Sequence, residues 1–198
     1  RSLANPQPQS TRLLTELIRP DSPNRPFLIT SPVCGPWSPL LAGDIASAAN
    51  DLGCLGVGVL DLRGLNLLTR EPATELTKDT SAHSNPARSL LRDIRVLRPA
   101  PELVADGKKI RAWVADQAEL CSPLVVLCGG TLDPNHWLED PLSWSFLKPR
   151  VLVACGRGQN TAEQISQTGD RLRRANLDLE GSVMVTRSRS FNVLNYLK

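Results

Sequence analysis

The sequence predicts an α/β domain of three layers, with a central, mostly parallel sheet and helices on both of its faces. Short, uninterrupted apolar runs recur along the chain, and such runs are typical of strands buried on both faces of a parallel sheet. Segments with helical spacing of apolar residues separate the runs, which is the alternation expected of α/β folds. The chain has 198 residues, 41% of them hydrophobic, so it can bury one sizeable core.

Six short and mostly apolar runs are predicted as strands. They cover residues 27–30, 55–60, 94–97, 124–128, 151–154 and 182–185. In a parallel sheet the carboxyl ends of the strands share one edge, and ligands bind at that edge. The loops after Thr30, Leu60 and Cys128 are therefore the expected place for a functional site.

Two helices are predicted in the first part of the chain. Residues 10–19 begin at a capping serine and carry a stripe of leucine and isoleucine at helical spacing. Residues 39–52 form the second helix, with Ser38 as the expected N-cap, Pro39 as the first helical residue and Gly53 just past the end.

The second half of the chain predicts two further helices and one broken helical stretch. Residues 106–120 place four apolar side chains on one side of a helix, and residues 161–175 form the last helix. Residues 129–134 are expected to turn, and the tryptophan-rich residues 136–146 form the broken stretch.

The loop after the first predicted strand has the outline of a phosphate-binding loop without its functional groups. A working loop ends in Gly-Lys-Ser/Thr, whose backbone N–H groups and lysine hold phosphate and whose hydroxyl holds Mg²⁺. Gly35 remains here, but Trp37, Ser38 and Pro39 stand where the second glycine, the lysine and the hydroxyl belong. Pro36 and Pro39 also lack a backbone N–H, and the Trp37 indole stands where backbone must approach phosphate closely. The loop is therefore predicted not to bind nucleotide.

Further motifs follow in a consistent order along the chain. They are LITSP at 28–32, LAGDIA at 41–46, VLDLR at 59–63, IRVLRPA at 94–100, GQNT at 158–161 and SVMV at 182–185. With these motifs, residues 10–187 resemble the cytoplasmic domain of bacterial tyrosine autokinases, MinD/ParA-type P-loop ATPases that control exopolysaccharide synthesis and export. The resemblance implies a single P-loop-NTPase-like domain at 10–187. Residues 1–9 are polar and rich in proline, so they are expected to form a disordered tail, and residues 188–198 are a C-terminal tail.

The departures from that family fall on its nucleotide site. The family's second strand ends in Asp-x-Asp-Leu-Arg; here Val59 replaces the first aspartate, while Asp61 and Arg63 are kept. Cys128 stands where the family's Walker B strand carries a carboxylate, and Tyr196 alone represents its C-terminal tyrosine cluster. Because phosphoryl transfer depends on positioning and on charge neutralisation by lysine and Mg²⁺, little catalytic machinery remains.

The resemblance and its departures together imply a catalytically inactive, pseudokinase-like protein with no catalytic residue, cofactor or metal. It would act as a cytoplasmic adaptor or regulator in exopolysaccharide synthesis and export. It would be held at the inner membrane by a partner such as a membrane polysaccharide co-polymerase. Two alternatives stay open: a divergent ATPase or tyrosine kinase that uses Asp61 and Arg63, and a MinD/ParA-like positioning or cellulose-secretion accessory protein.

Two segments are candidates for protein contacts. The family builds ring contacts with its early helix, so the resemblance implies self-association or partner docking through Arg12, Leu14 and Leu17. Trp37 either fills the vacated phosphate pocket or anchors a partner, since tryptophan is favoured at interface hot spots.

Composition excludes several other classes of protein. A net charge of +3 is too mild to argue for nucleic-acid binding. No apolar run approaches the roughly 18 residues of a membrane span, and no stretch has the pattern of a signal peptide. Five cysteines at scattered spacing and two distant histidines indicate a reduced, cytosolic protein without a metal site.

Two charged clusters have both a functional and a structural interpretation. Arg171, Arg173 and Arg174, with Arg150 and Arg157 expected nearby, could meet anionic lipid or an acidic partner, although a solvated helix face is the favoured interpretation. The acidic residues and the histidine of segment 133–140 could form a hydrolytic site, but they are better explained as surface loop residues.

Overall fold

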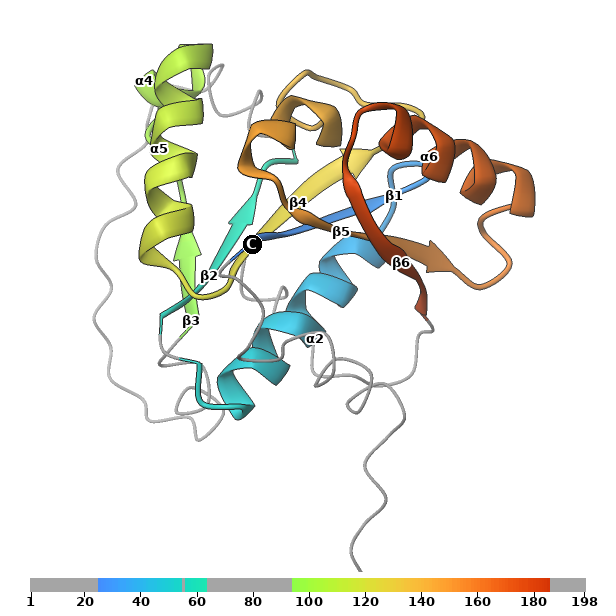
Figure 1. Cartoon of the computed structure of the whole chain (residues 1–198), viewed down its shortest axis with the longest axis horizontal. Coiled ribbons are helices and arrows are strands. Elements are labelled where there is room, and N and C mark those ends of the chain that lie inside the picture. Colours follow the sequence, from blue (N-terminus) through green and yellow to red (C-terminus); the bar gives the residue numbers. More distant parts are fainter. Residues whose placement is uncertain (1–24, 55, 64–93, 186–198) are drawn as a thin grey trace, which may run out of the picture.

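Six parallel strands form the centre of the computed structural model, which describes residues 25–54, 56–63 and 94–185 (Figure 1). Their order across the sheet is β3-β2-β4-β1-β5-β6. The strands are β1 Phe27–Ser31, β2 Val57–Asp61, β3 Ile94–Leu97, β4 Leu124–Gly130, β5 Arg150–Gly156 and β6 Asp178–Val185. All five pairings are parallel, so the predicted parallel sheet is confirmed.

The central strands are buried along their whole length because helices cover both faces of the sheet. Every residue of β1, β4 and β5 is buried, which explains their continuous apolar runs. In the edge strand β6, by contrast, exposed residues alternate with half-buried ones. The sequence pattern thus distinguishes the central strands from this edge.

Helices lie on the two faces in unequal number. Helix α2, Trp37–Asp51, packs on one face, where Ile45 and Ala49 meet apolar side chains of the sheet (Figure 1). The other face carries α4 Pro101–Val104, α5 Gly107–Leu120, the 3₁₀ helix η2 Pro141–Leu147 and α6 Ala162–Arg174. The predicted three-layer architecture is confirmed. No helix in the described parts of the chain is long and apolar enough to cross a membrane.

The predicted helices at 106–120 and 161–175 are confirmed, and their caps explain where they start. The Asp106 carboxylate accepts the N–H groups of Lys108 and Lys109 at 2.9 and 3.2 Å, and these bonds lower the pKa of Asp106. Thr161 and Gln164 form a reciprocal capping box at the start of α6.

Two local predictions were wrong. Helix α2 begins at Trp37 with Pro36 as N-cap, and Ser38 is buried in the first turn instead of capping the helix. Packing of the Trp37 ring against Gly156 holds residue 37 inside the helix and so moves its start upstream. Strand β4 also continues through Gly130, where a turn was expected, because Gly130 still pairs with Ser31 of β1.

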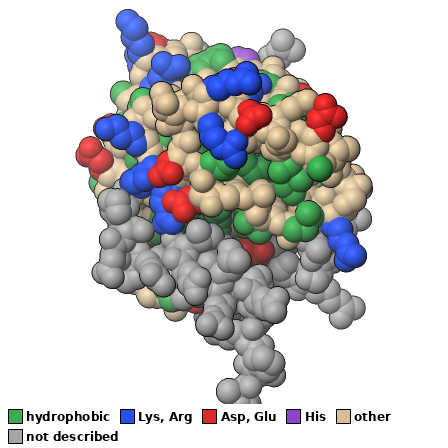
Figure 2. All heavy atoms as spheres, turned by 45° about the vertical axis from the view of Figure 1, so that its right-hand side comes forward, with side chains coloured by type: hydrophobic (Ala, Val, Ile, Leu, Met, Phe, Trp, Pro, Cys, Tyr) green, Lys and Arg blue, Asp and Glu red, His purple; other side chains and the backbone are tan. Residues whose placement is uncertain are grey.

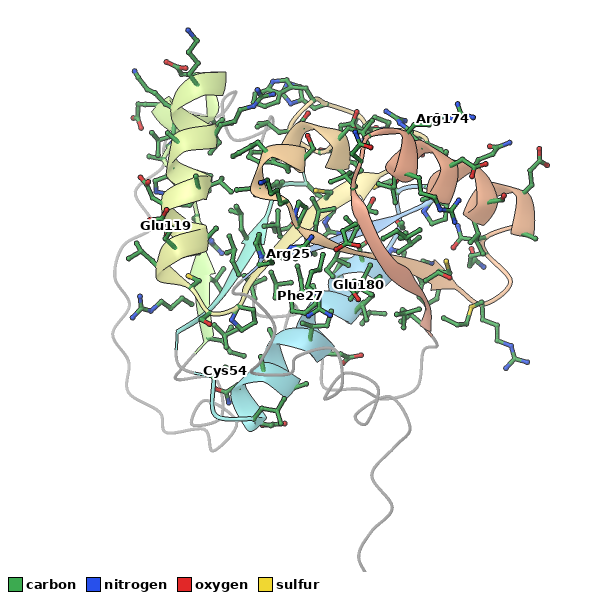
Figure 3. The ribbon with its side chains drawn as sticks, viewed as in Figure 1. Arg25, Phe27, Cys54, Glu119, Arg174 and Glu180 are labelled. Atoms are coloured by element: carbon green, nitrogen blue, oxygen red, sulfur yellow. The ribbon has the colours of Figure 1, made fainter. Side chains whose placement is uncertain are left out.

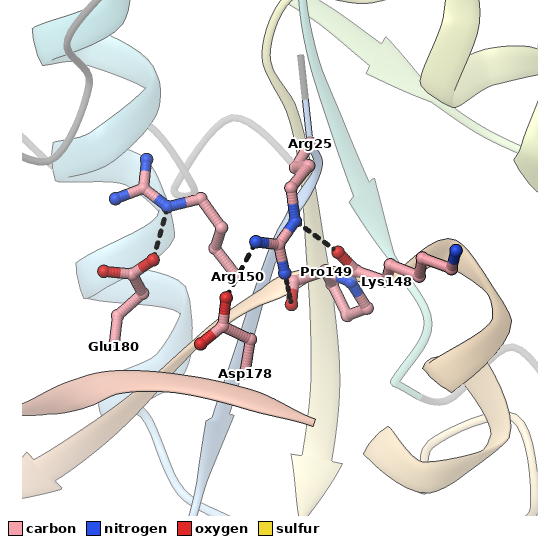
Figure 4. Close-up of polar contacts among 6 residues, drawn as sticks. All are labelled: Arg25, Lys148, Pro149, Arg150, Asp178 and Glu180. Carbon is pink, nitrogen blue, oxygen red and sulfur yellow. Dashed lines mark hydrogen bonds and ion pairs between the residues drawn. The ribbon is translucent and has the colours of Figure 1, made fainter. Parts of the chain in front are cut away.

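Ion pairs join β1, β5 and β6 at their amino ends, away from the expected site (Figure 4). Arg25 donates to the carbonyl oxygens of Lys148 and Pro149 at 2.7 and 3.2 Å, and to the Asp178 carboxylate at 2.7 Å. Arg150 donates to Glu180 at 2.6 Å, and its guanidinium lies 4.9 Å from the centre of the Phe27 ring.

These contacts show that Arg150 does not belong to the basic cluster of α6. Arg150 is the first residue of β5, and its ion-pair partner Glu180 lies far from Arg174 of α6 (Figure 3). The expected neighbourhood of Arg150 with the arginines of α6 was therefore wrong.

Candidate functional site

The carboxyl ends of four neighbouring strands meet at one edge of the sheet. Strands β2, β4, β1 and β5 are adjacent, so the loops that follow them lie side by side (Figure 1). The structure therefore brings the vestigial loop after β1 to the same edge as Asp61, Arg63 and the end of β4. This is where ligands bind in open α/β sheets.

The loop after β1 is tied to the chain that follows β4. Thr131 and Leu132 donate their N–H groups to the carbonyl oxygens of Ser31 and Pro32 at 2.7 and 2.9 Å. The Ser31 hydroxyl donates to the Val33 carbonyl at 2.7 Å. These bonds hold the loop through groups of the domain itself.

A carboxylate of the domain itself occupies one donor of the loop. The backbone N–H of Cys34 donates to Oδ1 of Asp133 at 3.1 Å. A Cβ atom at Gly130 would overlap this oxygen and would lie 2.6 Å from the Cys34 nitrogen, so the approach requires glycine. In nucleotide-binding loops such N–H groups point at phosphate instead. Here Asp133 stands in for an anionic ligand at one amide.

Trp37 packs across the end of β5. A Cβ atom at Gly156 would overlap the indole ring, with Cζ2 of the ring at 2.6 Å. The ring is half-buried and contacts the core on the α2 face of the sheet. The N–H of Gly156 donates to Oδ1 of Asn160 at 2.9 Å, which fixes the strand end under the ring. The indole therefore fills space beside the loop, with part of its surface left exposed.

Asp61 and Arg63 neutralise each other. Nε and Nη2 of Arg63 donate to the two carboxylate oxygens of Asp61 at 2.9 and 2.7 Å, and the Arg63 N–H adds a third bond at 3.1 Å. Such a bidentate pair satisfies both oxygens of the carboxylate. The two residues that keep the family's motif are thus bound to each other.

Cys128 lies fully buried inside β4. Burial raises the pKa of its thiol well above the ordinary value, and the nearby carboxylates of Asp140, Asp61 and Glu139 raise it further. The residue therefore presents a neutral thiol. A neutral thiol does not supply the anionic oxygen that orders Mg²⁺ and its water in a P-loop enzyme.

The acidic side chains of segment 133–140 have structural partners. Glu139 is buried and accepts from Asn135 Nδ2 at 3.2 Å. Asp140 caps η2 and accepts from Nη2 of Arg171 at 3.0 Å, while Nη1 of Arg171 donates to the carbonyl of Thr131. Within residues 25–54, 56–63 and 94–185, no group of three or more acidic, cysteine or histidine side chains is arranged to hold a metal ion.

The charges at this edge are unfavourable for a polyphosphate. No lysine stands in the described loops that follow β1, β2, β4 and β5. Arg63 and Arg171 are each paired with a carboxylate. A nucleotide would therefore have to compete with internal ion pairs for Arg63 and Arg171, while Arg157 in the loop after β5 is exposed and has no ion pair within the described part of the chain.

Sequence reasoning missed Asp133 as the partner of the loop and Gly130 and Gly156 as its contact points. The feature of the sequence that could have indicated this contact is the Gly-Gly pair at 129–130 followed by an aspartate three residues later. Other candidates, Arg12, Leu14, Leu17 and Tyr196 with the tails 1–9 and 188–198, lie outside the described residues.

Comparisons with known proteins support the fold. No family model and no curated protein matches the chain. The kinase domain of the Escherichia coli tyrosine kinase ETK superposes with a TM-score of 0.61 at 15% identity, over 90% of this chain and 74% of that one. The chain has the fold of a bacterial tyrosine kinase domain.

Two further solved structures are similar to the same extent. The BceF tyrosine kinase domain has a TM-score of 0.59 at 16% identity, covering 88% of this chain and 75% of its own. The chimerical protein CapA2B2 has a TM-score of 0.61 at 17% identity, covering 94% and 88%. The P-loop-NTPase-like fold implied by the sequence motifs is thus confirmed.

Proposed function

We propose that this protein is a catalytically inactive, tyrosine-kinase-like domain that acts as an adaptor or regulator in exopolysaccharide synthesis and export. One observation carries the proposal: the loop that would bind phosphate already donates to Asp133 and lies beside the packed Trp37 ring. The shape of the domain, which the similar solved structures share, would then serve protein contacts.

The missing contacts are large enough to abolish useful affinity. Hydrogen bonds between charged groups are each worth about 1.5–3 kcal/mol, so losing two or three weakens binding by roughly 3–9 kcal/mol. At about 1.4 kcal/mol per decade, a micromolar site weakens to about 0.1 mM or beyond. The absent lysine and the paired arginines act in the same direction.

A divergent ATPase is the less favoured function. It would need Asp61 for the metal ion or Arg63 for phosphate, and these side chains are bound to each other through two contacts of 2.9 Å or less. Breaking a half-buried bidentate pair leaves one charge without a partner. Nucleotide binding through these residues would have to offset that cost.

The family resemblance and the shared fold support the proposed adaptor role. The partner proposed is a membrane polysaccharide co-polymerase or another protein of the exopolysaccharide machinery, with the domain held at the inner membrane through it. Self-association is proposed through Arg12, Leu14 and Leu17, in the segment 10–19 that the sequence predicts to be helical. Trp37 is half-buried, and its exposed part is a further candidate for contact. Residues 10–187 are proposed as the folded unit.

Titration with nucleotide tests the catalytic part of the proposal. Isothermal titration of the full chain with ATP, ADP and GTP in the presence of Mg²⁺ should give no binding heat, and the melting temperature should not rise. Asp133→Asn, which removes the charge at the loop, should give the same result because the lysine is still absent. A dissociation constant below about 0.1 mM would overturn the proposal, since 1 mM already corresponds to only −4.1 kcal/mol.

A further inference from the structure

A cavity of about 440 Å³ lies between α6 and η2, outside the site described above. One lining residue comes from η2, and the others come from α6 and its C-cap. The lining residues are Leu142, Gln167, Asp170, Arg171, Arg174 and Ala175. The cavity therefore combines two guanidinium groups, one carboxylate and a small apolar surface.

Arg171 is held rigidly at the wall of this cavity. Two of its N–H groups donate to the Thr131 carbonyl and to the Asp140 carboxylate, and Asp140 in turn caps η2 at the N–H of Leu142. Asp140 offsets the charge of Arg171, so the unpaired positive charge at the cavity comes from Arg174, while the N–H donors of Arg171 that remain of its five can still bind a ligand. A side chain that is already ordered loses little conformational entropy when it binds.

Arg174 provides the second cation. It stands one helical turn after Arg171, so both side chains reach the same face of α6. Arg174 pairs with no carboxylate in the described parts of the chain, whereas the Asp170 carboxylate on the same wall is engaged by Arg173 at 2.9 Å. Arg174 projects from the outer surface of α6 (Figure 3).

The surrounding surface narrows the class of ligand. Acidic groups stand among the cations here, since Asp140 pairs with Arg171 and Asp170 lies in the wall of the cavity, and the face of the molecule in Figure 2 likewise mixes basic, acidic and apolar side chains. This mixture does not form the continuous basic patch that binds an anionic membrane. Asp170 in the wall also disfavours a dianion such as phosphate, while Leu142 and Ala175 suit an apolar neighbour of a single carboxylate.

We propose that the cavity between α6 and η2 binds an acidic side chain of a partner protein, with Arg171 and Arg174 as the ligands of its carboxylate and Leu142 and Ala175 as the contact for an adjacent apolar residue. This inference rests on the adaptor part of the proposed function and names the chemistry of the partner segment. It does not depend on the loop after β1, so a nucleotide titration does not decide it.

The test uses the full ¹⁵N-labelled chain and a short probe peptide, acetyl-ELEEL-amide. The peptide should shift the Nε–Hε signals of Arg171 and Arg174 and the amide signal of Leu142 in a saturable way. Arg174→Glu should weaken binding by roughly tenfold or more, because removing one partner of a charge pair raises the dissociation rate. Arg157→Glu makes the same change of net charge at an exposed position in the β5–α6 loop and should leave the affinity unchanged.

Three results would overturn the proposal. The first is the absence of a saturable shift up to 5 mM peptide in the folded protein, where roughly 1 mM is already weak binding. The second is equal binding of acetyl-QLQQL-amide, which would show that the carboxylates are not recognised. The third is Arg174-dependent binding to phosphatidylcholine vesicles containing phosphatidylserine but not to the peptide, which would assign the surface to a membrane.

Discussion

The backbone N–H of Cys34 donates to the carboxylate of Asp133 at 3.1 Å, across 99 residues of sequence. This bond joins the loop after β1 to the loop after β4 at the edge of the sheet where α/β proteins bind ligands. A negatively charged group therefore already sits at an amide of the vestigial loop. The loop is shaped by the domain's own residues.

Asp133→Ala should loosen this loop. The loss of a hydrogen bond to a charged acceptor on the surface should lower the free energy of unfolding by about 1 kcal/mol, and hydrogen exchange should quicken at the amides of residues 33–35. Asp133→Asn keeps an oxygen acceptor and should have a smaller effect. Glu119→Ala removes an exposed carboxylate of α5 and serves as the control (Figure 3). Unchanged exchange in Asp133→Ala would show that the bond does not order the loop.

Gly156→Ala should destabilise the domain, because the new methyl group would overlap the Trp37 ring. Overpacking of this kind typically costs about 1–3 kcal/mol. The cost should fall in the background of Trp37→Ala, so a double-mutant cycle measured by denaturant unfolding should show coupling. Gly35→Ala is the matched control, since its Cβ would meet Trp37 at an ordinary 3.4 Å. Additive effects of the two substitutions would contradict the contact.

Cys128→Asp would restore the family's carboxylate but should not restore nucleotide binding. The position is fully buried, so the new charge would be desolvated among Asp61, Glu139 and Asp140. The free energy of unfolding should fall by about 3 kcal/mol or more in Cys128→Asp. In Cys128→Ala it should fall clearly less. Thermal melts and Mg-ATP titration measure both outcomes. Stabilisation of the aspartate variant by Mg-ATP would mean that the site retains more of its function than proposed.

Stability should fall at alkaline pH because of the buried thiols. The pKa of Cys128 is raised above its ordinary value of 9.0, so the folded state keeps the proton after the unfolded chain has released it. The contribution is complete below the unfolded pKa and is lost as pH rises beyond it, by up to about 1.4 kcal/mol per pH unit for one thiol. Cys128→Ala should flatten the dependence between pH 8.5 and 10. An unchanged slope would exclude Cys128 as a source.

Replacing Leu14 and Leu17 with aspartate should reduce self-association or partner binding. The prediction rests on the apolar stripe of residues 10–19 and on the family resemblance. Light scattering should show a lower mass for the double variant, and circular dichroism should show an unchanged fold. If the variant unfolds instead, the helix belongs to the core and the assembly role is not supported. Thr15→Asp, between the two leucines, controls for added charge.

The elements that sequence reasoning found are those whose residues carry a local signal. The uninterrupted run from Leu124 predicted a strand buried on both faces, and apolar spacing predicted the helix at 106–120, whose start the structure shows to be capped by Asp106. Ser38 misled the prediction, because a capping residue does not cap when the preceding residue is already packed into the helix. Gly129 and Gly130 were expected in a turn because glycine is common in turns, but pairing with β1 keeps them in strand β4.

The sequence by itself determined the parallel sheet, the order of its strands along the chain and the residues that stand where a P-loop enzyme would carry its lysine, hydroxyl and carboxylate. Residue identity and local periodicity contain all of this information. Only the tertiary structure decided that Asp133 meets Cys34, that Trp37 covers Gly156 and that Arg171 joins α6 to the loop after β4. Those contacts link residues about 40 to 120 positions apart in the sequence. They depend on the paths of loops and on packing in space, and neither leaves a local pattern in the sequence.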